Sequence, residues 1–439
     1  MRNYSSFGIQ IPDLLIPKPG IDLSKWAVIA CDQFTSQPDY WDKVKKIVGQ
    51  SPSTLKLILP EVFLGKPEET GIISNINLTM RNYLQEKVLV PSEGMILVER
   101  TISHGIRHGL ILALDLEKYD YHKESTSLIR ASEGTILERL PPRMRIRENA
   151  TLELPHILVL IDDPQKEIIE PLWEKSEKYN CIYDFDLILS SGHLRGFLIN
   201  DVAMEKELVG KLEKCIRPDY YKNKYQLSGD VPPILFAVGD GNHSLATAKA
   251  VWEKKKASLS SDHPLRYALV EIENIHDPGL VFEPIHRVLF GPRQDIHASL
   301  NGFFRKLDIT RCSTFDEMKK MVQQSDPINH FIGLIEDDLL ELISINRPDN
   351  QLATGSIQSF LDDIMKKKGA EGIDYIHGDD AILSISQKQG NVGFYLPPMQ
   401  KSELFKTVIL EGALPRKTFS MGEAIDKRFY LECRQIQTE

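Results

Sequence analysis

Residues 236–250 read FAVGDGNHSLATAKA and change character twice within one short stretch. Apolar residues continue to Val238, a Gly-Asp-Gly-Asn-His segment follows, and the alanine-rich remainder predicts a helix. In that helix Leu245, Ala248 and Val251 recur at helical spacing, so one face can pack on the preceding strand. The stretch therefore predicts a strand, a tight turn and a helix in immediate succession.

The residue types in this turn suit a bound anion. A helix start offers free N–H groups and the positive end of the helix dipole, and Gly239 and Gly241 let the backbone approach a ligand closely. Asp240 is a candidate ligand for a divalent metal or a proton acceptor. His243 is a candidate hydrogen-bond donor to a phosphate, or a group for proton transfer. The alternative is that Asp240 or Asn242 only shapes the turn and caps the helix.

The composition is that of a globular protein, and the cysteine pattern fits a reducing compartment. The chain has 439 residues, 42% of them hydrophobic and 26% charged, which favours two domains or one elaborated domain. No apolar run approaches the roughly 18–20 residues that cross a membrane, and the N-terminal stretch lacks the pattern of a signal peptide. The five cysteines are scattered, with no CxxC pair, so we expect a cytoplasmic protein without a disulfide framework.

The balance of charge indicates small-molecule partners. The formal net charge is −9, whereas nucleic-acid binders usually carry a basic excess that neutralises phosphates. We expect neither a nucleic-acid nor a membrane partner. The sequence leaves the oligomeric state open.

Strand and helix patterns mix along the whole chain and predict an α+β (mixed α/β) fold. The polar, turn-rich segment 254–264 predicts a boundary between an N-terminal α/β region, 1–260, which carries the turn, and a C-terminal α/β region, 261–439. A buried strand is expected from Trp26 to Ala30, and a helix over 166–178.

Two basic clusters are candidates for holding phosphate, because the guanidinium fork matches phosphate oxygens and stays charged. The alternative for the cluster within 129–148 is a solvated loop whose arginines pair with its own glutamates. The first cluster, within 129–148, comprises Arg130, Arg139, Arg143, Arg145 and Arg147, and the second comprises Arg416 and Lys417.

The GDGNHS turn between a strand and an alanine-rich helix resembles the DGHHR turn of the ParB/sulfiredoxin-like superfamily. The chain as a whole resembles a family of that superfamily catalogued as a domain of unknown function, one branch of which comprises free-serine kinases that use inorganic pyrophosphate. The stretches 129–163, 375–382 and 414–432 support this likeness. One departure is that Ser244 stands where the more usual turn has arginine, so another cation must supply that charge.

The resemblance implies a ParB/sulfiredoxin-like core with large α/β elaborations, and a Mg²⁺-dependent kinase that converts L-serine to O-phosphoserine with pyrophosphate. Asp240, also the expected metal ligand, and His243 would serve the transferred phosphoryl group. The remaining turn residues and the basic clusters would bind the donor; these are Gly239, Gly241, Asn242, Ser244, Arg130, Arg139, Arg143, Arg416 and Lys417.

The acceptor hydroxyl requires a base, because a serine hydroxyl is a poor nucleophile at neutral pH. Asp32, after the expected strand, is the candidate general base or contact for the serine amino group, although aspartate also commonly forms turns. His377 is a candidate contact for phosphate or substrate, against a purely structural role. Asp162 and Asp163 precede a proline and are better explained as a turn.

Three alternatives stay open. An ATP- or ADP-dependent serine kinase would use the same scaffold, although no Walker-type or kinase-type glycine-rich loop is present. A ParB-like nucleotide-responsive DNA-binding or regulatory protein would need a basic recognition helix. A sulfiredoxin-like reductase would need a reactive cysteine near the turn, for which Cys31 is the candidate.

Overall fold

The computed structural model describes residues 2–437, and contacts divide the chain into two compact units. One unit contains the residues up to Leu280 together with those from Gly422 onward, and the other contains Val281–Met421. The sequence places a boundary after residue 260, whereas the contacts place it after Leu280. The reason is that β15 (Tyr267–Asn274) pairs with strands of the first unit on both of its sides.

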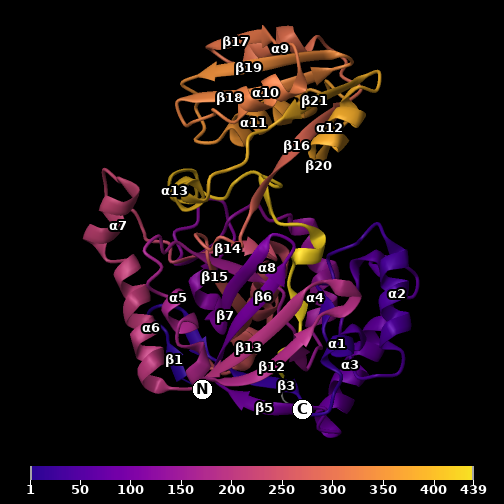
Figure 1. Cartoon of the computed structure of the whole chain (residues 1–439), viewed down its shortest axis with the longest axis vertical. Coiled ribbons are helices and arrows are strands. Elements are labelled where there is room, and N and C mark those ends of the chain that lie inside the picture. Colours follow the sequence, from indigo (N-terminus) through magenta and orange to yellow (C-terminus); the bar gives the residue numbers. More distant parts are fainter. Residues whose placement is uncertain (1, 438–439) are drawn as a thin grey trace. The chain divides into compact units, whose positions relative to one another are not determined.

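The first unit is built on a large mixed sheet (Figure 1). Its main path runs β12-β13-β6-β7-β15-β11-β14-β9-β8, and β1 and β2 extend from β7. Within the described residues the strands are β12 (Asn180–Asp186), β13 (His193–Ile199), β6 (Met95–Ile102), β7 (Gly105–Asp115), β15, β11 (Leu158–Ile161), β14 (Phe236–Asp240), β9 (Ile129–Ala131), β8 (Tyr119–Asp120), β1 (Arg2–Tyr4) and β2 (Ile9–Ile11).

The neighbours of β14 decide what surrounds the quoted turn. β9 runs parallel to β14, with Ala131 opposite Val238, and β11 runs antiparallel, with Leu158 opposite Asp240. The residues after β9, those after β14 and those before β11 therefore meet at one end of the sheet. We call this the β9–β14 end.

The C-terminal segment, residues 422–437, belongs to the first unit and adds strands to two small sheets. β24 (Cys433–Gln435) pairs with β10 (Leu152–Glu153) and β3 (Asp13–Pro17), and β3 pairs with β5 (Leu89–Glu93). β23 (Phe429–Tyr430) pairs with β4 (Val28–Ile29). Segments from the two ends of the chain are thus held side by side.

The helices of the first unit gather around the sheet, with α1, α2 and α3 at one side of the unit and α6 and α7 at the other (Figure 1). As expected, α8 buries Leu245, Ala248 and Val251. Within the described residues the helices are α1 (Leu23–Trp26), α2 (Pro38–Val48), α3 (Glu69–Gln85), α4 (Leu140–Arg147), α5 (Glu170–Trp173), α6 (Val202–Cys215), α7 (Pro218–Tyr225) and α8 (Asn242–Lys255).

Two expected elements are shorter than predicted. Trp26 ends α1, and only Val28–Ile29 of the expected strand pair with a partner. The expected helix over 166–178 is reduced to α5 and a short 3₁₀ turn, Ser176–Lys178. Pro171 accounts for the second difference, because proline fits the first turn of a helix but not its interior.

The second unit is a sheet covered by helices on both faces. Adjacent residues on its strands separate into two cores: Leu289 and Phe394 pack with α9 and α11, whereas Val288 and Tyr395 pack with α10 and α12. The described strands are β17 (Leu307–Arg311), β19 (Leu339–Asn346), β18 (Asn329–Glu336), β21 (Asn391–Tyr395), β16 (Phe282–Phe290), β20 (Gly372–His377) and β22 (Phe419–Met421). The described helices are α9 (Ile296–Phe303), α10 (Phe315–Val322), α11 (Ala353–Lys366), α12 (Asp379–Ser386) and α13 (Lys401–Glu411).

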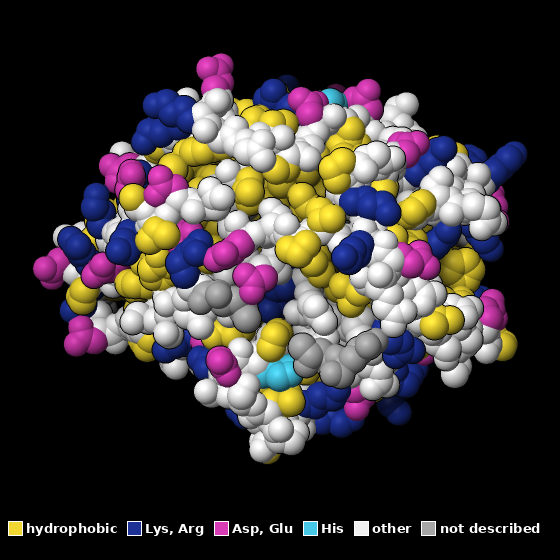
Figure 2. All heavy atoms as spheres, turned by 90° about the horizontal axis from the view of Figure 1, so that it is seen from below, with side chains coloured by type: hydrophobic (Ala, Val, Ile, Leu, Met, Phe, Trp, Pro, Cys, Tyr) yellow, Lys and Arg dark blue, Asp and Glu magenta, His cyan; other side chains and the backbone are white. Residues whose placement is uncertain are grey.

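These units confirm the α+β class. On the face that Figure 2 shows, Lys and Arg side chains are interspersed with Asp and Glu side chains, and this arrangement gives no basic stripe there of the kind that tracks a nucleic-acid backbone. Among residues 2–437, no helix combines the length and the apolar character that a membrane span requires.

Buried charges hold the C-terminal segment against the large sheet. The Arg428 guanidinium lies 2.8 Å from Glu271 and 2.6 Å from Glu432, and all three side chains are at most 2% exposed. Tyr183 donates a hydrogen bond from its hydroxyl to Glu432. The Tyr183 ring covers Gly196 on the neighbouring strand, where a Cβ would lie 2.0 Å from the ring.

We expect Gly196→Ala to destabilise the first unit by about 1–3 kcal/mol, because the added methyl group overpacks the Tyr183 ring. Gly210→Ala is the matched control: Gly210 lies in α6 with no atom within 4 Å of an added Cβ, so the variant should gain roughly 0.5–1 kcal/mol. Urea unfolding measures both. Equal stability of the two variants would contradict the packing described here.

Candidate functional site

The quoted turn is a strand–turn–helix unit, as expected. β14 ends at Asp240, Gly241 has φ +81°, and α8 begins at Asn242. A Cβ on Gly241 would lie 3.1 Å from the Cα atom of Ile157, so both the backbone conformation and the close approach favour glycine here. The Gly241 N–H donates to Asp240 Oδ1 over 3.0 Å.

The cation beside Asp240 is Lys427, from the C-terminal segment. Its Nζ atom lies 3.3 Å from Asp240 Oδ2, and its side chain is 9% exposed. Burial acts to raise the pKa of Asp240, but Lys427 and then His156 outweigh it and hold that pKa below its usual value. Lys427 lies in the stretch 414–432, where only Arg416 and Lys417 were predicted to bind phosphate, so its role was not foreseen from the sequence.

The loop after β9 lies against the start of α8. The Ile136 N–H donates to His243 Nε2 over 3.2 Å. Among the described residues, three buried oxygen atoms here have no hydrogen-bond partner: Ser132 Oγ, Thr135 Oγ1 and Asn242 Oδ1. Such atoms cost about 1–3 kcal/mol each when buried, so their gathering at the β9–β14 end is typical of a site that a polar ligand completes.

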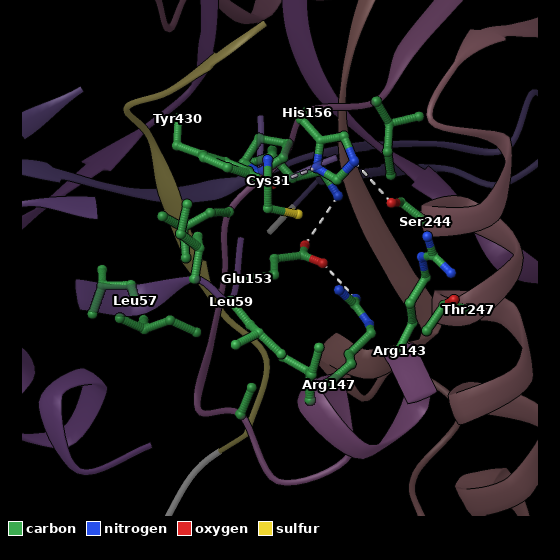
Figure 3. A pocket seen from close by; sticks show the side chains of 18 of the residues that line it. Cys31, Leu57, Leu59, Arg143, Arg147, Glu153, His156, Ser244, Thr247 and Tyr430 are labelled. Atoms are coloured by element: carbon green, nitrogen blue, oxygen red, sulfur yellow. Dashed lines mark hydrogen bonds and ion pairs between the residues drawn. The ribbon is translucent and has the colours of Figure 1, made fainter. Parts of the chain in front are cut away.

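His156, just before β11, links α8 to the C-terminal segment (Figure 3). Its Nε2 atom lies 2.8 Å from Ser244 Oγ, and its Nδ1 atom lies 2.8 Å from the Tyr430 hydroxyl oxygen. That hydroxyl oxygen also accepts the Cys31 N–H over 3.2 Å. The stretches 129–163 and 414–432 contain His156 and Tyr430, but the sequence analysis assigned neither residue a role.

Two acidic side chains approach from the N-terminal part of the chain. Asp32 Oδ2 lies 3.8 Å from His156 Nε2. Glu61 forms an ion pair with Arg143; burial raises the Glu61 pKa, and Arg143 offsets part of that rise. The predicted base Asp32 therefore lies near the turn, in a loop after β4.

The thiol of Cys31 lies in the same region but is not activated. Burial, followed by the charge of Asp32, raises the pKa of Cys31 well above its usual value. A reactive cysteine has a lowered pKa and an electropositive environment. This environment disfavours the sulfiredoxin-like alternative.

A cavity of about 140 Å³ opens beside His156 and Ser244 (Figure 3). Arg147 and Glu153 form an ion pair in its wall, and Arg434 holds the same glutamate at 2.6 Å. Most of the remaining wall is apolar. The residues that line the cavity include Leu57, Leu59, Leu64, Met80, Ile146, Ala150 and Ile157, with Arg143 and Thr247 as further polar members.

The structure brings together only part of the predicted site. Arg143 lines the cavity together with Ser244 of the turn, and Asp32 lies 3.8 Å from His156, another lining residue. Arg130 is buried, and its guanidinium donates to the carbonyl oxygens of Ser127 and Pro232 over 2.7 Å each. Arg139 is exposed, and its carbonyl oxygen accepts from Arg143 over 2.9 Å.

Three other predicted residues belong to the second unit. His377 ends β20, and Arg416 donates to the Tyr375 hydroxyl over 3.0 Å. Lys417 follows Arg416 and has φ +59°. The roles of these residues, like those of Arg130 and Arg139 in phosphate binding, stay predictions.

The turn can supply oxygen ligands to a metal only in combination with a substrate. Among the described residues, no three His, Cys, Asp or Glu side chains form a metal-binding group. Mg²⁺, however, is commonly held by one or two protein oxygens plus substrate phosphates and water. The Asp240 carboxylate and the unpartnered Asn242 Oδ1 fit that mode.

Comparison with known proteins finds one matching family and several solved structures of low sequence identity. The model of a family described as "Protein of unknown function (DUF1015)" matches residues 15–368. No curated protein sequence matches the chain.

Solved structures that resemble the chain include a conserved hypothetical protein from Pyrococcus furiosus (12% identity, TM-score 0.34) and a free serine kinase in complex with AMP (10% identity, TM-score 0.38). Each covers 73% of this chain and 90% of the other. C-terminally truncated SbnI from Staphylococcus aureus has 13% identity and a TM-score of 0.34, covering 71% of this chain and 83% of its own.

The charge of Lys427 has a measurable effect on stability. In the native protein the lowered Asp240 pKa contributes stability above the unfolded pKa of about 4, and this contribution is lost as the pH falls through the folded pKa. In Lys427→Met that opposing charge is lost, and we expect burial to raise the Asp240 pKa. We expect the free energy of unfolding to fall by about 2 kcal/mol at pH 7 and by less toward pH 5, because protonation of Asp240 removes the unpaired charge.

Urea unfolding at pH 7, 6 and 5 measures this dependence, with Lys427→Arg as the control that keeps the positive charge. A loss of the same size at all three pH values would mean that Lys427 acts through packing alone.

Proposed function

We propose that this chain, which belongs to the DUF1015 family of proteins of unknown function, transfers a phosphoryl group to the hydroxyl of free L-serine and forms O-phosphoserine. One observation carries the proposal. The β9–β14 end of the sheet combines a helix N-terminus and unpartnered buried oxygens with a histidine and an aspartate 3.8 Å apart. Phosphoryl transfer needs an anion cradle, a balancing cation and a positioned base.

The donor in this proposal is inorganic pyrophosphate, bound at the turn. The first N–H groups of α8 and the hydroxyl groups of Ser132 and Thr135 would bond its oxygens. Lys427 would supply the charge that arginine provides in the more usual turn, since it already lies 3.3 Å from Asp240. Asp240 and Asn242 would hold Mg²⁺, which when bound neutralises charge on the donor phosphates.

The acceptor in this proposal is bound on the His156 side of the turn. Asp32 is the general base for the serine hydroxyl, and Glu61 is a second carboxylate suited to the ammonium group of an amino acid. Glu61 N–H donates to the Cys31 carbonyl over 2.8 Å, which fixes the glutamate next to the loop of Asp32. His243 would contact the transferred phosphoryl group.

The cavity favours a nucleotide as a second candidate donor. Its apolar wall, with Leu57, Leu59 and Met80, offers a surface for a flat ring that pyrophosphate lacks, and Arg143 lies in the same cavity. An ATP- or ADP-dependent serine kinase would use this wall for the base and the turn for the phosphates.

A donor screen tests the proposed function. Purified protein is incubated with L-serine and Mg²⁺ plus pyrophosphate, ATP or ADP, and phosphorus NMR detects O-phosphoserine. We expect product with pyrophosphate, and a loss of about 100-fold or more in Asp240→Asn, because the proposed Mg²⁺ ligand loses its charge. Asp262→Asn, an exposed aspartate in the first unit, is the matched control and should retain full activity.

Product with a nucleotide alone would replace pyrophosphate by the second candidate donor. No product with any of the three donors would show that the serine-kinase proposal is wrong.

Narrowing the cavity separates the two donors. Ala150 is 4% exposed and lines the cavity, so Ala150→Leu should raise the KM for a nucleotide about tenfold by occupying the space of the base. With pyrophosphate, kcat/KM should stay unchanged, because that donor does not enter the apolar part. Steady-state kinetics with each active donor measures the effect, and an equal loss with both would contradict this use of the cavity.

A further inference from the structure

Two hydroxyl side chains of the cavity lie beside His156, Ser244 at Nε2 and Tyr430 at Nδ1, and Ser244 is the one that belongs to the turn. The hydroxyl-bearing lining residues among those described are Ser244, Thr247 and Tyr430. Thr247 donates its proton to the His243 carbonyl over 2.7 Å, and Tyr430 has a strongly raised pKa because of burial. Ser244 Oγ instead lies 2.8 Å from His156 Nε2.

The surroundings of His156 position its Nε2 atom. Asp32 Oδ2 lies 3.8 Å from that atom, and Ser244 Oγ lies 2.8 Å from it. Tyr430 fixes the ring through Nδ1 over 2.8 Å, so that Nε2 faces Ser244.

Ser244 also lies close to the groups that are proposed to bind the phosphoryl donor. It is the third residue of α8, whose N-terminus follows Gly241, and it lies two residues after Asn242 with its unpartnered Oδ1. A phosphoryl group bound at the turn would lie beside the Ser244 hydroxyl, on the cavity side of the helix. The hydroxyl is therefore positioned as a nucleophile rather than only as a ligand.

We propose that Ser244 is itself phosphorylated by the donor bound at the turn. Ser244 Oγ forms a bond to the terminal phosphorus, the bridging P–O bond of the pyrophosphate or nucleotide breaks, and the leaving phosphate or nucleoside phosphate keeps that electron pair. The Oγ proton passes to His156 Nε2. The inference rests on the phosphate-donor part of the proposed function and is independent of the acceptor.

Intact-protein mass spectrometry after incubation with Mg²⁺ and each donor, without L-serine, tests the inference. We expect one added phosphoryl group, located at Ser244 by fragmentation, and none in Ser244→Ala. His156→Asn should slow the labelling by about 100-fold or more, as loss of a general base does. His156→Gln is a second variant should the first not fold, and Ser258→Ala, an exposed serine near the end of α8, should label as the native chain does.

The outcomes separate this inference from the proposed function. O-phosphoserine formation with an unmodified Ser244 would overturn the inference alone, as would a phosphoryl group on His156 instead. Labelled Ser244 without any O-phosphoserine would support the inference and remove free serine as the acceptor. Absence of both products with every donor would overturn both proposals.

Discussion

The buried guanidinium of Arg428 fixes the segment on which the candidate site depends. It is paired with Glu271 on the large sheet and with Glu432 within its own segment, at 2.8 and 2.6 Å. Removing one member of such a group would leave an uncompensated buried charge, which typically costs about 3–5 kcal/mol. The arrangement keeps Lys427 beside Asp240 and Tyr430 beside His156.

The site itself follows from strand direction. Because β9 and β14 run parallel and β11 runs antiparallel to them, their adjoining loops open at the same end of the sheet. Among the described residues, hydroxyl and amide oxygens there have no partners, and Lys427 balances the half-buried Asp240. Buried polar atoms without partners reduce stability, and this is why the β9–β14 end is a candidate for ligand binding.

Much of the turn was predictable from local patterns. The glycine at φ +81°, the helix start at Asn242 and the buried face of α8 follow from backbone preferences and helical periodicity. Asp32 was predicted as the general base from its residue type and its place after a strand, and it lies near His156, although that strand is only Val28–Ile29. The strand is short because burial and apolar character do not by themselves provide pairing partners along the whole stretch.

The sequence by itself determined the α+β class and the strand–turn–helix unit, because these depend on neighbours within a few residues. Only the tertiary structure decided which cation faces Asp240 and which histidine faces Ser244. Lys427 lies 187 residues from Asp240 in sequence, and His156 lies 88 residues from Ser244. Contacts at such separations are set by strand pairing and buried charge, which no local pattern records.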